Sequence, residues 1–144
     1  MIEIVNSDWD GDMVFNSDVD GHLVHFDADE KSGGTFLGAR PKPVVLAALA
    51  ACTGMDVVSI LRKKQVSFTA FRISVSGETP EVHPKYYKKI HLKYILSGDG
   101  FAGNAEIRTK TERAVTLSRD TYCAVSAMLK NSCKITDEII LLDS

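Results

Sequence analysis

The chain has 144 residues, a hydrophobic fraction of 44% and a net charge of -2 from 17 Lys and Arg against 19 Asp and Glu. This length favours a single domain, residues 1–144, and the balanced charge gives no indication of nucleic-acid or anionic-membrane partners. The first residues lack the pattern of a signal peptide, and no uninterrupted apolar run approaches the ~20 residues of a membrane span, so a cytoplasmic location is expected.

The first forty residues predict short strands that are joined by tight turns. Apolar runs over 13–15 and 22–26 follow the turn dipeptides Asp10-Gly11 and Asp20-Gly21, which favour hairpins. The aspartates of this region lack the spacing of an EF-hand loop. We therefore interpret them as turn residues and not as calcium ligands.

A long helix is predicted from about residue 44 to residue 64, with Pro41 and Pro43 at its start, where proline is tolerated. Residues 44–52 are apolar on every face. Such a segment is expected to be buried on all sides. A small monomer provides little cover of this kind, which favours a second copy against the helix.

The rest of the chain is predicted to form two strands, then two helices and a last strand. Residues 68–76 and 87–96 alternate apolar and polar side chains and predict a hairpin with one solvated face. Helices are predicted over 104–117 and 122–130, followed by a strand over 134–142. This segregated order indicates an α+β fold with antiparallel sheets.

The candidate reactive residues of the sequence are its three cysteines, Cys52, Cys123 and Cys133. An odd number without CxxC or Cys/His spacing predicts neither a disulfide framework nor a metal site. Cys123 falls in the first turn of a predicted helix, where the dipole lowers a thiol pKa. From the residues alone, Cys52 reads as a buried core residue, Cys123 equally as core or as a reactive thiol, and Cys133 as structural.

Two segments together resemble the signatures of the OsmC/Ohr family, named for osmotically inducible protein C and organic hydroperoxide resistance. PKPVVLAALAACTGMDVVSIL (41–61) has the signature proline, the alanine-rich apolar helix and the first cysteine, and YCAVSAML (122–129) has a second cysteine shortly followed by Val-Ser. The ending MDVVSIL is more similar to the broad OsmC-like branch than to classical Ohr. The resemblance implies an α+β fold that forms an intertwined homodimer with two central helices.

The resemblance also implies a thiol peroxidase without a cofactor. Cys52 would be the peroxidatic residue, which attacks the O–O bond of an organic hydroperoxide and becomes a sulfenic acid. Cys123 would be the resolving residue, which condenses with it to a disulfide. A small dithiol or a lipoylated protein would then restore both thiols.

The chain departs from the classical pattern beside the signature proline. Classical members have a Glu at the position of Lys42 and an Arg near the N-terminal hairpin, whereas the first arginine here is Arg40. Arg40 or Lys42 could supply the positive charge that favours a thiolate, or both are ordinary solvated residues at a helix start. Asp56 lies on the helix face of Cys52. It would either oppose thiolate formation there or make a polar contact across the dimer.

Three hypotheses stay open from the sequence. The first is a dithiol-dependent hydroperoxide reductase. The second is a non-peroxidase OsmC-like domain that binds a small apolar or thiol-reactive ligand at the dimer interface. The third is a structural dimer whose cysteines are core residues. Pairing of Cys52 with Cys123 under mild peroxide separates the first hypothesis from the other two.

Overall fold

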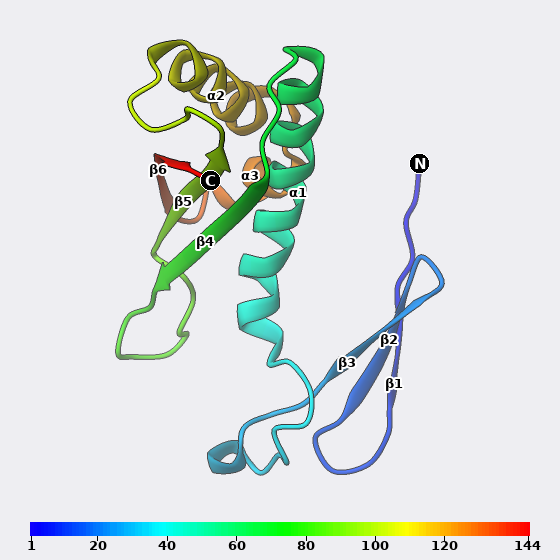
Figure 1. Ribbon diagram of the computed structural model, residues 1–144. Helices are drawn as coiled ribbons and strands as arrows, with labels where there is room; N and C mark the ends of the chain where they lie inside the picture. The colour runs from blue at the N-terminus through cyan, green and yellow to red at the C-terminus, as the bar shows by residue number, and fades with distance from the viewer. The chain divides into compact units, whose positions relative to one another are not determined.

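A computed structural model describes all 144 residues, which fold into two compact units, 1–45 and 46–144. Figure 1 shows the strands and helices of each unit. The prediction of one domain over the whole chain stays a prediction. The elements of the first unit are β1 (Asn6–Trp9), β2 (Phe15–Val19), β3 (His22–Phe26) and the 3₁₀ turn η1 (Glu30–Ser32), and those that follow are α1 (Pro41–Lys63), β4 (Ala70–Glu78), β5 (Lys89–Gly98), α2 (Ala105–Leu117), η2 (Ser118–Tyr122), α3 (Ala124–Leu129) and β6 (Lys134–Asp143).

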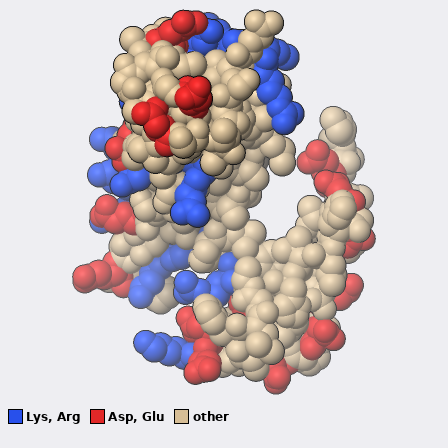
Figure 2. Space-filling model, viewed as in Figure 1, with Lys and Arg blue, Asp and Glu red and all other residues tan.

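The first unit is a small antiparallel sheet in the order β1-β2-β3. Gly21 has a φ of +80° in the turn between β2 and β3, a conformation that glycine adopts without steric cost. Asp27 ties down the loop that follows, since its carboxylate accepts the Thr35 hydroxyl at 2.7 Å and the Ala28 N–H at 2.7 Å. Acidic residues outnumber basic ones in this unit, and Figure 2 shows their red side chains along it.

The second unit is built on a sheet in the order β4-β5-β6. β4 and β5 pair antiparallel, which confirms the predicted hairpin, whereas β5 and β6 pair parallel. The parallel pair follows from the helical connection between these strands, because parallel neighbours need a crossover of about a dozen residues or more. The α+β class is confirmed. Alternate residues of β5 face the core and are buried: Ile90, Leu92, Tyr94 and Leu96.

Helix α1 supplies the other half of the core through one stripe of side chains. Leu49, Thr53, Val57 and Leu61 are buried, and their spacing of four residues places them on one face. The other faces are more open, and Met55 is 72% exposed. The expected burial on all sides is therefore not reached within a single chain.

The length and composition of α1 would also suffice for a membrane span. One 18-residue window within it has a mean hydropathy of 2.2, and 28% of that window is buried. The core helix of a soluble protein passes the same test, so the observation alone is weak evidence for a membrane. What it does establish is an extensive apolar surface on α1 that the chain itself leaves uncovered.

The C-terminal helices differ from the sequence expectation at one point. Asn104 caps α2 as predicted, because its side chain accepts the Ile107 N–H at 3.0 Å. The next helix begins at Ala124 and not at residue 122, since the intervening η2 is a wide turn with π-helical bonding. The N–H of Cys123 closes this turn on the Ser118 carbonyl at 2.8 Å. Cys123 is thus the residue that precedes and caps α3.

Candidate functional site

Two of the three thiols lie beside each other in the second unit. Cys52 projects from the middle of α1 and is half-buried, and Cys123 at the start of α3 is 3% exposed. Cys52 lies close enough to Cys123 to contribute to raising the pKa of the Cys123 thiol. Cys133 points elsewhere and donates to the Leu129 carbonyl at 3.3 Å. The fold therefore pairs residues 71 positions apart and leaves the third cysteine out.

Burial dominates the electrostatics of Cys123. The helix start does favour a thiolate, because the sulfur accepts the Ser126 N–H at 3.4 Å. Removal from water nevertheless raises the pKa of Cys123 above its ordinary value, and the neighbouring Cys52 raises it further. The expectation of a lowered pKa at this position was wrong, since desolvation penalises the charged thiolate more than the helix start stabilises it. At neutral pH Cys123 is a thiol.

A chain of buried hydroxyl groups lies beneath the cysteines. Thr53, next to Cys52, is 2.9 Å from the Tyr94 hydroxyl and 2.8 Å from the Ser118 hydroxyl. Ser118 donates in turn to the Asp56 carboxylate at 2.8 Å. Tyr94, Thr53 and Ser118 are each at most 2% exposed, and burial raises the pKa of Tyr94 to about 12. Three elements, α1, β5 and η2, are thus joined by one polar network at the site.

Three members of this network, Tyr94, Thr53 and Ser118, were not identified as site residues from the sequence. The alternation of β5 did indicate that Tyr94 faces the core, and Thr53 directly follows a candidate cysteine. Ser118 gave no such signal, because only the fold brings it to α1. Asp56 was identified, and within the single chain its carboxylate accepts the Ser118 hydroxyl. A contact of Asp56 across a dimer stays a prediction.

A further charged residue adjoins this network in the chain: Arg119, which directly follows Ser118 and was not singled out from the sequence. Arg119 donates to Asp137 at 2.7 Å and to Asp120 at 2.9 Å, and these bonds raise its pKa. Its charge and that of Asp137 both act on Tyr94. A permanent cation, balanced by two carboxylates, therefore borders the buried hydroxyls.

The two candidate activating cations lie elsewhere on the chain. Arg40 pairs with Asp29 at 3.6 Å, in the first unit. Lys42 is in the first turn of α1, ten residues before Cys52, which corresponds to about 15 Å along the helix axis. Helix geometry thus prevents Lys42 from contacting Cys52 of its own chain. An activating role for either cation stays a prediction, and for Lys42 it needs a second copy.

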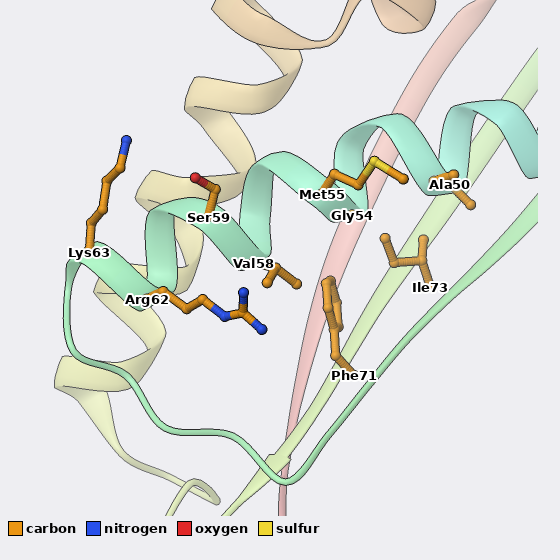
Figure 3. A pocket seen from close by; sticks show the side chains of 10 residues that line it. Ala50, Gly54, Met55, Val58, Ser59, Arg62, Lys63, Phe71 and Ile73 are labelled. Atoms are coloured by element: carbon orange, nitrogen blue, oxygen red, sulfur yellow. The ribbon is translucent and has the colours of Figure 1, made fainter. Parts of the chain in front are cut away.

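An open apolar groove runs along α1 on the side of β4. Figure 3 shows Phe71 and Ile73 of β4 pointing toward Gly54 and Met55 of α1, with Arg62 and Lys63 at one end. The groove has a volume of about 780 Å³. It is bordered by Ala51, the neighbour of Cys52 in the chain. The exposed apolar side of α1 therefore continues from the cysteine region onto the sheet.

Comparisons with known proteins give a consistent match. The family model described as "OsmC-like protein" matches residues 31–138. Protein YhfA of Escherichia coli K12 is 32% identical over 116 residues, which cover 81% of this chain and 80% of that protein. A hypothetical protein from Aquifex aeolicus VF5 superposes with a TM-score of 0.79 at 29% identity over 98% of both chains.

A more distant structure shares the fold alone. It is described as an organic hydroperoxide resistance protein OsmC and predicted redox protein from Legionella pneumophila. It superposes with a TM-score of 0.68 at 13% identity over 97% of both chains.

Proposed function

The chain belongs to the OsmC-like protein family, and from that premise we propose that it is a thiol-dependent peroxidase that reduces organic hydroperoxides. The observation that carries the proposal is the adjacency of two free thiols of unequal exposure, Cys52 half-buried and Cys123 buried. Cys52 is accessible to a substrate, and Cys123 lies beside it, shielded from solvent. A redox role for OsmC and Ohr relatives agrees with such a pair.

The reaction proceeds in two steps on these thiols. The Cys52 thiolate attacks the peroxide, so that an S–O bond forms, the O–O bond breaks and the leaving alkoxide takes a proton from water to become the alcohol. Cys52 is oxidised to a sulfenic acid while the peroxide gains two electrons. The sulfur of Cys123 then attacks the sulfenic sulfur, an S–S bond forms, and water leaves with the proton of Cys123. A small dithiol or a lipoylated protein is oxidised to its own disulfide and returns both thiols.

We propose a homodimer as the working form, with a cytoplasmic location. The support for the dimer is the apolar groove between α1 and β4, with Met55 72% exposed, because soluble monomers rarely leave continuous apolar patches of large size uncovered. The occupant that we assign to this groove is a second copy of the chain. An intertwined pair would also cover exposed apolar side chains of the first unit, such as Trp9 and Leu23.

Substrate preference tests the proposed function. With a small dithiol as reductant, we expect the protein to consume cumene hydroperoxide at least about tenfold faster than hydrogen peroxide, because an apolar body is transferred from water to the apolar surroundings of Cys52. The measurement is the initial rate of peroxide loss, with reductant alone as the blank. Equal rates for both peroxides would contradict an organic substrate. No consumption above the blank would favour the binding of an apolar or thiol-reactive ligand instead.

A further inference from the structure

A second hollow, the α1–η2 recess, borders helix α1 and has a volume of about 590 Å³. Figure 3 shows Lys63 and Ser59 of α1 pointing away from Phe71 of β4, whereas Arg62 points toward it. The recess therefore opens on another side of α1 than the groove along β4. Its lining comes from three elements and the turn after α1: Asp56, Ser59, Ile60, Lys63, Lys64, Leu117 and Tyr122.

The two ends of the α1–η2 recess carry opposite charges. Lys63 and Lys64 are at one end, and neither forms an ion pair within the chain. Asp56 is at the other end, seven residues before Lys63, which corresponds to about 10 Å along the helix axis. The partial negative charge at the end of α1 is about half an elementary charge, so two full positive charges outweigh it. An anion is thus attracted to the lysine end and repelled from the Asp56 end.

The wall between the two ends is mainly apolar. Ile60 of α1 and Leu117 of α2 are half-buried, and the ring of Tyr122 is 60% exposed. A hydrocarbon chain gains free energy when it moves from water onto such a surface. Two lysines and one aspartate give the recess a net charge of +1. A singly charged carboxylate neutralises this charge, whereas a doubly charged phosphate monoester exceeds it.

The Asp56 end of the recess is the end nearer to the cysteine pair. Asp56 follows Cys52 by one helical turn, which places their Cβ atoms about 5–6 Å apart. On the facing wall, Tyr122 directly precedes Cys123 in the chain. The lysine end lies further along α1, away from both cysteines.

We propose that the α1–η2 recess binds an organic carboxylate with an apolar chain. The carboxylate lies at Lys63 and Lys64, the chain lies against Ile60, Leu117 and Tyr122, and the uncharged end points toward Asp56. The site itself does not depend on the peroxidase reaction. Its consequence for catalysis, which rests on the proposed function, is that a bound substrate presents an uncharged end to the thiols.

Titration of the isotope-labelled, reduced protein with octanoate tests this site by NMR. We expect saturable shifts of the backbone amides of Lys64, Leu117 and Tyr122. Octanamide has the same chain without the charge, and we expect it to bind about tenfold more weakly, because each exposed lysine contributes a modest attraction. Octanedioate should bind about threefold more weakly than octanoate, because its second carboxylate would lie beside Asp56.

Two variants at the end of α1 distinguish the recess from the groove along β4. Lys64 lines only the recess, and Arg62 lines only the groove. We expect Lys64→Gln to weaken octanoate binding about fourfold, the effect of one exposed charge pair. Arg62→Gln removes a neighbouring charge of the same sign and should leave the affinity unchanged.

Four results would overturn the proposal. These are an absence of saturable shifts with octanoate, equal affinities for octanoate and octanamide, the largest shifts at Phe71 and Ile73 of the groove, and equal weakening by Arg62→Gln and Lys64→Gln. Octanedioate that binds as tightly as octanoate would overturn the assigned orientation. No peroxide is present in the titration, so failure of this site and failure of the proposed peroxidase activity are distinguishable.

Discussion

Replacing Cys52 with serine is expected to abolish peroxide turnover. Without the sulfur no sulfenic acid forms, and the buried Cys123, whose pKa is raised, cannot take its place at neutral pH. We expect the loss to be at least about 100-fold, down to the blank rate, because the two remaining thiols, Cys123 and Cys133, are both buried and burial raises the pKa of each. The measurement is the steady-state consumption of cumene hydroperoxide with a small dithiol.

Two further serine variants serve as comparisons for the Cys52→Ser result. Cys123→Ser should consume about one equivalent of peroxide and then stop or over-oxidise, since nothing resolves the sulfenic acid. Cys133→Ser should turn over at the wild-type rate, because Cys133 lies apart from the pair and bonds only to Leu129. Wild-type turnover in Cys52→Ser would refute the assignment of the peroxidatic residue.

A charge in the groove beside α1 is expected to dissociate the dimer. Met55→Glu places a carboxylate between α1 and β4, at a position 72% exposed in the single chain and buried in the proposed dimer. Burial of an unpaired charge costs several kcal/mol, so we expect the dimer to weaken by at least about 100-fold, equivalent to about 3 kcal/mol. Light scattering during size exclusion over a range of protein concentrations measures the change.

The matched control is a charge on the opposite face of the same strand. Ser74 alternates with Ile73 on β4 and is exposed, so Ser74→Glu should leave association unchanged. A wild-type protein that is monomeric at all concentrations would contradict the dimer. A Met55→Glu variant that dimerises as tightly as the wild type would instead remove this groove from the interface.

The parts of the fold that depend on local periodicity were predictable from the sequence. The alternation over residues 68–76 and 87–96 predicted the antiparallel pair β4–β5, and Asn104 capped α2 as expected. The wide turn η2 was not predictable, because its bonding from Cys123 to Ser118 has no local sequence signature. The same turn moves Cys123 from the first turn of a helix to the residue before it.

Site residues were predictable from the sequence only where the signal lay within a single helix or strand. The two cysteines could be identified from their segments, but their adjacency depends on how α3 packs against α1. The raised pKa of Cys123 depends on burial, which no window of sequence reports. The bonds among Thr53, Tyr94 and Ser118 join residues 41 and 65 positions apart. Pairwise contacts of this kind come from tertiary packing and leave no periodic pattern.

The pairing of Cys52 with Cys123 is tested most directly by mapping the disulfide that forms after a single oxidation. The reduced protein is treated with one equivalent of cumene hydroperoxide, the remaining thiols are alkylated, and the peptides are identified by mass spectrometry. We expect two of the three thiols to be lost per chain, one disulfide between Cys52 and Cys123, and Cys133 recovered in alkylated form. Recovery of both Cys52 and Cys123 as free thiols, or a disulfide that contains Cys133, would contradict the assignment of these two residues as the redox pair.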